Sequence, residues 1–182
     1  MRRRSLMFVV VPVLSLLYSC AQPAPPELDL GEVAQFVIAQ TGGVPPAADP
    51  CNGDTILLQY PIVLLPLNRE LCLNCANIGW LLREWRRSEI VEPLVVVTSS
   101  ADTRETCDYL RRERATVPVL VLDEPALPTW WPALKTVLLA EATAPGALGR
   151  MAGGPDGAAL VAAWPSVQPQ SSSGAMIQPP SP

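Results

Sequence analysis

Histidine is absent from this chain of 182 residues. That absence excludes the Ser-His-Asp and Cys-His hydrolases, in which an imidazole acts as the general base. It also excludes zinc sites that contain histidine and the Cys-x-x-Cys-His attachment of haem. Any chemistry of this protein must therefore rest on other side chains.

A hydrophobic run long enough to cross a membrane is missing at the N-terminus. The apolar run from Leu6 to Tyr18 has only about a dozen residues, which is too short to span a hydrocarbon core of ~30 Å as a stable helix. It follows Met1-Arg2-Arg3-Arg4, and a cationic start before a short apolar run is typical of an export signal. We therefore expect the protein to be exported.

The stretch Leu17-Tyr18-Ser19-Cys20 resembles the lipobox of bacterial lipoproteins. The resemblance implies that residues 1–19 are removed as a signal peptide and that Cys20 carries acyl chains such as palmitate. The mature protein would then be anchored to the periplasmic or outer face of a bacterial membrane without spanning it. An ordinary secretory signal with an incidental cysteine is the alternative.

Composition divides the remaining chain into three parts. Residues 20–48 hold a proline-rich spacer, which should be extended, and one short helix over Gly31–Gln40. Residues 49–165 have the length and apolar content of a single folded domain. Residues 166–182 are mostly Ser, Pro and Gln and are expected to be disordered.

Positive charge is scarce in the mature chain. Without residues 1–19, ten basic side chains face 17 acidic ones, which gives a formal charge of about −7. Most of these arginines fall in two helical stretches, interleaved with Glu84 and Glu113. This pattern is typical of solvated helix faces, so we expect no nucleic-acid partner.

Turn signals and apolar runs predict alternating strands and helices. The runs Ile62–Leu67, Pro93–Val97 and Val117–Leu122 are apolar on both faces, as expected of strands covered on two sides. The other predicted elements are strands at Thr55–Gln59, Lys135–Ala140 and Ala147–Met151 and helices at Cys75–Arg87, Thr103–Arg114 and Gly157–Trp164. The fold class that follows is α/β, with a central mixed sheet flanked by helices in three layers.

Four cysteines remain once Cys20 is assigned to lipid. Four is an even number, and disulfides persist in an oxidising compartment. Cys51 and Cys107 either pair with each other or remain lone thiols. Cys72 and Cys75 form a Cys-x-x-Cys pair between the buried strand Ile62–Leu67 and the helix that follows it.

The Cys-x-x-Cys pair has a chemical reason to be reactive. A thiol at the first turn of a helix faces unpaired backbone N–H groups and the positive end of the helix dipole, which favour the thiolate. In such sites the cysteine pKa falls from ~8.5 to between ~3.5 and ~7.5. Cys72 should attack and Cys75 should resolve the mixed disulfide, a reaction that needs no cofactor. Arg69 would assist the thiolate, whereas Glu70 would oppose it.

The order of elements around this pair resembles the thioredoxin fold. It is most similar to the membrane-anchored TlpA and ResA type of thiol-disulfide oxidoreductase, over residues from about 50 to 164. The resemblance implies partners that are exported proteins with cysteines, in relatives often cytochrome c or other metalloprotein precursors. It also implies a membrane reductant donor for the pair.

Two features depart from that family, and a third departs from its peroxide-reducing relatives. Leu73-Asn74 stands between the cysteines, with neither proline nor glycine. The family places a cis-proline before the first strand of the final hairpin, where this chain has Leu134, with Pro132 two residues early; another alignment makes Pro118 that residue. Peroxide-reducing relatives carry a threonine four positions before the reactive cysteine, where Asn68 stands.

Two other functions stay open on the sequence. The first is a structural disulfide in a non-catalytic, thioredoxin-like lipoprotein that binds a partner, with Trp130-Trp131 either packed on the core or forming an apolar docking patch. The second is metal binding by the pair, although copper-delivery relatives add a histidine. A four-cysteine zinc site would need Cys51 and Cys107 to converge on the pair.

Overall fold

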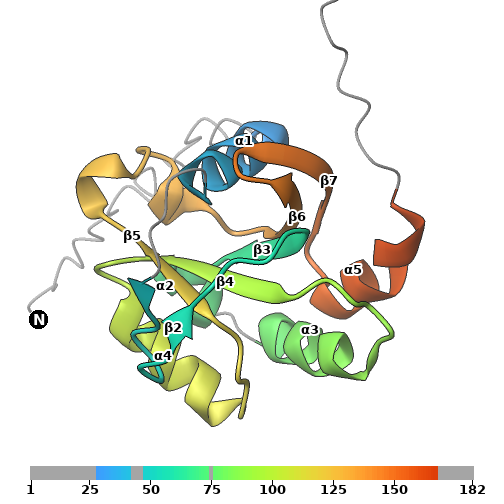
Figure 1. Ribbon diagram of the computed structural model, residues 1–182, viewed down its shortest axis with the longest axis horizontal. Helices are drawn as coiled ribbons and strands as arrows, with labels where there is room; N and C mark the ends of the chain where they lie inside the picture. The colour runs from blue at the N-terminus through green and yellow to red at the C-terminus, as the bar shows by residue number, and fades with distance from the viewer. Residues whose placement is uncertain (1–27, 42–46, 74–75, 168–182) are drawn as a thin grey trace, which may run out of the picture.

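The computed structural model describes residues 28–41, 47–73 and 76–167 (Figure 1). Its elements in chain order are α1 (Leu30–Gln40), β1 (Ala47–Ala48), β2 (Thr55–Ile56), β3 (Ile62–Pro66), α2 (Arg69–Leu73), α3 (Ala76–Arg87), β4 (Leu94–Ser99), α4 (Thr103–Arg112), β5 (Val119–Leu122), η3 (Glu124–Ala126), η4 (Trp131–Ala133), β6 (Val137–Ala144), β7 (Ala147–Gly154), α5 (Gly157–Ala163) and η5 (Trp164–Ser166).

Five of the strands form one mixed sheet in the order β5-β4-β3-β6-β7. β3, β4 and β5 are parallel to one another, with Leu64 opposite Val95 and Val97 opposite Leu120. β6 runs antiparallel to β3, and β7 returns antiparallel to β6 as a hairpin. The mixed sheet predicted from the sequence is therefore confirmed.

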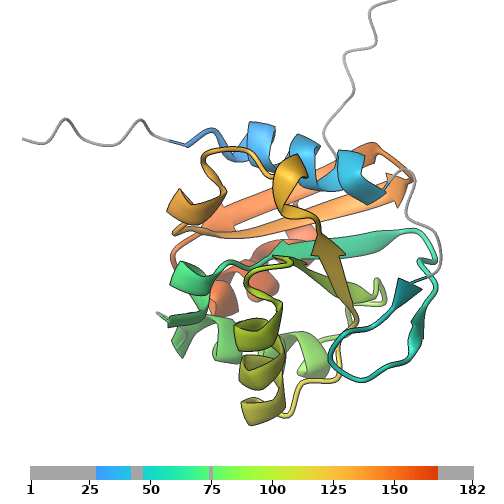
Figure 2. The same ribbon diagram turned by 90° about the vertical axis from the view of Figure 1, so that its left-hand side faces the viewer.

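Helices cover both faces of this sheet. The crossovers from β3 to β4 and from β4 to β5 step in the same direction, and right-handed crossovers then place α3 and α4 on one face. α5 packs against α3 on that face, while α1 packs across β6 and β7 on the other. Figure 2 shows α1 on one side of the sheet and α3 and α4 on the opposite side. The expected three layers are present.

The two central strands are buried along their whole length. Every residue of β3 and of β4 is buried, which explains why their sequences are apolar without alternation. Thr98 and Ser99 are the polar exceptions at the end of β4, and the hydroxyl of Thr98 lies 3.0 Å from that of Thr106 on α4. This buried hydrogen bond fixes α4 against the sheet.

The first predicted strand is much shorter than expected. Only Thr55 and Ile56 pair with a partner, the two residues of β1, and this small hairpin stays separate from the main sheet. Leu57, the next residue, is 66% exposed and lies outside the strand pairing. The chain reaches β3 through Tyr60–Pro61, which is a cis peptide bond.

A side chain and a glycine set the ends of the later elements. Asp156 precedes α5 and its carboxylate accepts hydrogen bonds from the backbone N–H groups of Ala158 (3.0 Å) and Ala159 (3.2 Å). Gly146 has a φ of 73° at the turn between β6 and β7, a conformation that favours glycine. The final hairpin and helix therefore lie where they were expected.

A cluster of mostly buried charges joins the last strand to the rest of the domain. Arg150 on β7 forms ion pairs with Glu92 (2.5 Å) and with Glu141 on β6 (3.1 Å). Its guanidinium also lies over the ring of Trp164, 4.6 Å from the centroid. These contacts tie η5, β6 and the segment before β4 to β7.

Substitution of Gly157 tests the contact between α3 and α5. A Cβ at this position would lie 2.7 Å from the carbonyl oxygen of Asn77 and 2.8 Å from Cβ of Leu81, so the helices must separate. In an open helix Gly→Ala stabilises by up to about 1 kcal/mol. We expect Gly157→Ala instead to destabilise the fold by about 1–3 kcal/mol in urea unfolding, because overpacking forces the backbone to shift.

Gly154→Ala is the matched control. The nearest atom to its Cβ would be Cδ2 of Leu160 at 3.6 Å, an ordinary contact. A change in Gly157→Ala no larger than that of this control would show that α3 and α5 are not closely packed.

Candidate functional site

A cavity of about 420 Å³ lies where the three parallel strands end. Its wall is formed by residues that follow β3 (Asn68, Arg69, Glu70), by residues at the end of β4, and by the segment between β5 and β6, including Trp131. In open α/β sheets ligands bind outside the carboxyl ends of the strands. This cavity is therefore the first candidate for a functional site.

Cys72 belongs to α2, the short helix at the edge of this cavity. The sequence placed it at the start of the helix predicted over Cys75–Arg87, but in the structure the chain is already helical from Arg69, three residues before Cys72. The correction has a physical cause: Asn68 accepts a hydrogen bond from the N–H of Leu71 (2.8 Å) and so starts a helix before Cys72. The helix-terminus argument for a reactive Cys72 is weaker as a result, because Asn68 already occupies one of the free N–H groups.

Asn68 makes two further contacts across the cavity wall. It is 1% exposed, and its Nδ2 donates to the carbonyl oxygens of Trp131 (2.7 Å) and Leu134 (3.0 Å). Sequence reasoning noted Asn68 only as a departure from a family pattern. The available signal was an asparagine between a buried strand and a helical segment, a preferred N-cap residue.

The end of β4 forms a second fixed wall. The hydroxyl of Ser99 donates to the carboxylate of Asp102 (2.8 Å), and the N–H of Asp102 returns a hydrogen bond to that hydroxyl (3.0 Å). Thr103 donates from its hydroxyl to the carbonyl oxygen of Ser99 (2.8 Å). The sequence predicts a helix from Thr103, and these hydrogen bonds form the turn into it, although the Asp102 side chain does not bond a helix N–H.

The tryptophan loop packs on the domain rather than forming an exposed patch. Trp131 is 2% exposed, and Trp130 is half-buried with its ring edge-on to Phe36 of α1 at 5.5 Å. Of the two alternatives left open by the sequence, packing on the core is the one found, with Trp130 against α1. The exposed indole is Trp80 on α3, at 52%.

Several predicted site residues fall outside what the structure describes. Cys20 and Cys75 lie outside the described residues, and for Cys72 only the backbone is described. At the proposed cis-proline positions the described peptide bonds are trans, since Tyr60–Pro61 is the cis bond found among the described residues. Arg69 and Glu70 are both exposed and both line the cavity.

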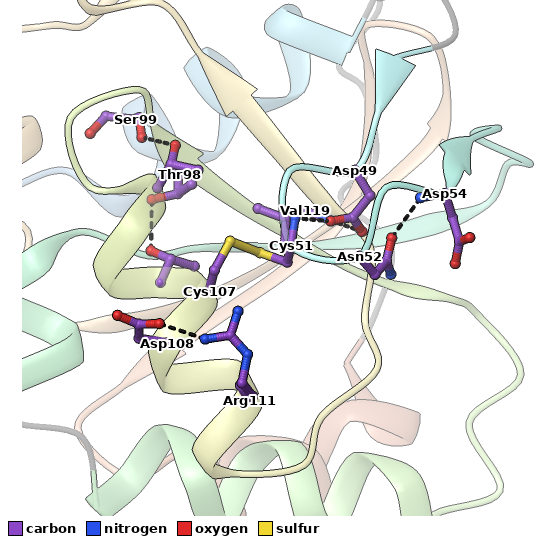
Figure 3. The surroundings of a disulfide bond; sticks show 12 residues. Asp49, Cys51, Asn52, Asp54, Thr98, Ser99, Cys107, Asp108, Arg111 and Val119 are labelled. Carbon is purple, nitrogen blue, oxygen red and sulfur yellow. Dashed lines mark hydrogen bonds and ion pairs between the residues drawn. A yellow bond between two sulfur atoms is a disulfide. The ribbon is translucent and has the colours of Figure 1, made fainter.

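Cys51 and Cys107 form a disulfide, the question that the sequence left open (Figure 3). The bond joins the β1–β2 turn to the middle of α4 across 56 positions of sequence. The turn is held from within by Asp49, which is 2% exposed and accepts from the N–H groups of Cys51 (2.8 Å) and Val119 (3.1 Å). The hairpin is thus fixed to both α4 and the edge strand β5.

This pairing removes two of the four cysteines that a zinc site would need. Cys51 and Cys107 bond to each other, so they are not free to join Cys72 and Cys75 in a four-cysteine zinc site. Among the described residues, no group of three or more His, Cys, Asp or Glu side chains is placed to hold a metal ion.

A larger cavity of about 560 Å³ lies at the other end of the strands. It is bordered by the β1–β2 hairpin, by Ile62 and by Pro118, and its walls are mainly apolar. Size alone favours this cavity, but the smaller one lies beside α2, the helix to which Cys72 belongs. We therefore assign the candidate site to the smaller cavity.

Comparisons with protein-family models, with curated proteins and with solved structures give no match. Within the described part of the chain, no helix is both long and apolar enough to cross a bilayer.

Removing the disulfide tests its contribution to stability. Closing a loop of this length should stabilise the fold by up to about 4 kcal/mol through the entropy of the unfolded chain. We expect the double substitution Cys51→Ala, Cys107→Ala to lower the free energy of unfolding by about 2–4 kcal/mol in urea. A strong reductant should lower the wild-type value by a similar amount and leave the double variant unchanged; equal stability of both proteins under oxidising conditions would contradict the pairing.

Proposed function

We propose that this protein is a lipid-anchored, extracytoplasmic thiol-disulfide oxidoreductase with a thioredoxin-like fold, acting through Cys72 and Cys75 on cysteines of exported proteins. One observation carries the proposal: the Cys-x-x-Cys segment directly follows the central strand β3, at the carboxyl edge of the sheet and beside a cavity. That edge is where α/β sheets place their binding and reacting groups.

The arrangement of the neighbouring elements supports the resemblance to thioredoxin. The segment lies between β3 and α3, α3 packs against the final helix α5, and the antiparallel hairpin β6–β7 extends the sheet beyond β3. β5 adds a parallel strand at the other edge, as expected of the exported relatives.

The reaction follows from the two thiols. The Cys72 thiolate attacks one sulfur of a partner disulfide, forming a mixed disulfide while the other partner sulfur leaves as a thiolate and takes up a proton. The Cys75 thiolate then attacks the Cys72 sulfur, which forms the Cys72–Cys75 disulfide and releases the partner as a dithiol. Two electrons pass to the partner, and a membrane dithiol donor restores the reduced pair by the same exchange in reverse.

The Cys51–Cys107 disulfide supports an extracytoplasmic location, because such bonds persist in oxidising compartments. The signal-like N-terminus and Cys20 support the same assignment through a lipid anchor. Exported proteins whose cysteines must be kept reduced, such as precursors of metalloproteins, are the matching class of partner.

Two cysteine variants test the proposal. We expect Cys72→Ser to reduce insulin only at the uncatalysed background rate, because the attacking thiolate is gone. We expect Cys75→Ser to trap a mixed disulfide with partner proteins, since nothing resolves it. The adduct is measured by non-reducing electrophoresis and mass spectrometry of the protein isolated from its membrane.

The double variant Cys51→Ala, Cys107→Ala is the control, and its rate of exchange at a temperature where it stays folded should match that of the wild type. Absence of insulin reduction by the wild type, together with absence of any adduct in Cys75→Ser, would refute the proposed function.

A non-catalytic binding module is the second candidate, and the exposed Trp80 favours it. The indole lies on α3 with the guanidinium of Arg83 4.8 Å from its ring centroid, a rigid, part-apolar surface that suits a protein contact. In that case Trp80→Ala would abolish capture of the natural partner, whereas Cys72→Ser and Cys75→Ser would bind as the wild type does.

A further inference from the structure

The side chain of Asn68 connects two segments that the chain places far apart. Asn68 ends the buried run of β3, while Trp131 and Leu134 lie more than 60 positions later, in the loop before β6. Both segments line the same cavity, Asn68 and Trp131 directly. A single amide thus determines how the two sides of the cavity stand relative to each other.

Every hydrogen-bonding group of this amide except one lone pair is used. Oδ1 accepts from the N–H of Leu71 at the start of α2 (2.8 Å), and the two hydrogens of Nδ2 go to the carbonyl oxygens of Trp131 (2.7 Å) and Leu134 (3.0 Å). The side chain is 1% exposed, so water does not compete for these contacts. Aspartate, serine or threonine could supply the acceptor for α2, but none could supply both donors for the loop.

The two contacts of Asn68 act on different parts of the site. The acceptor contact caps the helix that contains Cys72, and the donor contacts hold the backbone of the loop that faces this helix across the cavity. The side chain of Trp131 adds apolar packing to the same loop but no hydrogen bond, since its Nε1 is buried without a partner. The hydrogen bonds from the Asn68 amide therefore orient the backbone of this loop beside α2.

We propose that Asn68 is a positioning residue of the exchange site: by holding the loop that contains Trp131 and Leu134 at a fixed place beside α2, it sets how a polypeptide in the cavity presents its disulfide to Cys72. This inference rests on the proposed function. The amide does not react, and small disulfides that need no contact with the loop bypass it.

Asn68→Ser separates the two contacts, because serine is a good N-cap residue but cannot reach or donate to both carbonyls. The full chain in detergent is assayed with two probes, insulin as a polypeptide disulfide and dithiobis-nitrobenzoate as a small one. We expect the kcat/KM for insulin to fall roughly tenfold or more, as the loss of two hydrogen bonds allows. The rate with the small disulfide should stay within about twofold of the wild type, because the cap persists.

Two further variants complete the comparison. Asn68→Ala removes the cap as well, so both probes should react more slowly and the pH dependence of the small-probe rate should shift. Asn52→Ser is the matched control: Asn52 is exposed on the β1–β2 turn and accepts from the N–H of Asp54 (2.9 Å), and its substitution should change neither rate.

The outcomes are distinct. A wild type inactive with both probes would refute the proposed function and this inference with it, whereas Asn68→Ser acting on both probes like the wild type would refute this inference alone. If Asn68→Ser does not fold, as judged by circular dichroism, Pro132→Gly replaces it, since Pro132 is exposed and glycine loosens the same loop without touching Asn68. Pro132→Gly must then lose activity on insulin selectively; equal rates to the wild type on both probes would overturn the proposal.

Discussion

The burial of β3 is the constraint on which the rest of this structure depends. The strand is paired on both edges, with β4 and with β6, and helices cover both of its faces. A parallel neighbour can be reached only through a crossover, so α3 must return along the sheet before β4 begins. The antiparallel neighbour β6 must come from the other direction, which the chain achieves through the loop that carries η4. Burial of one strand therefore fixes both the helix and the loop that meet at its carboxyl end.

Asn68 is a buried polar residue just after the apolar strand β3. The residues of β3 satisfy their backbone groups within the sheet, but the strand's end would leave backbone groups of α2 and of the incoming loop unpaired in a buried place. One asparagine supplies partners for both, which is why a polar side chain is tolerated at 1% exposure. The same amide that completes the packing of the strand also defines the cavity beside Cys72.

Local sequence patterns were sufficient to predict most of the fold. The apolar runs of β3, β4 and β5 predict strands within a few residues of those observed, because burial on two faces leaves no alternation to misinterpret. What failed depended on distant residues. The helical start at Arg69 follows from a contact of Asn68 with Leu71, and the packing of the tryptophan loop follows from contacts of Trp130 with Phe36 on α1 and of η4 with α2. The disulfide partner of Cys51 likewise depends on where α4 docks, which spacing alone could not decide.

The strong clamps of the domain lie away from the candidate site. Asp49 and the Cys51–Cys107 disulfide fix the β1–β2 hairpin to the start of β5 and to α4, and Arg150 with Glu92 holds the segment that enters β4. Covalent and ionic contacts thus stabilise the amino ends of the strands, while the carboxyl edge is held by hydrogen bonds and packing. Contacts of the second kind can be adjusted by single substitutions without loss of the fold, because the covalent clamp and the buried ion pairs remain. Because the amino ends of the strands are held firmly, a loop at the carboxyl edge can change in sequence while the scaffold that positions it stays intact.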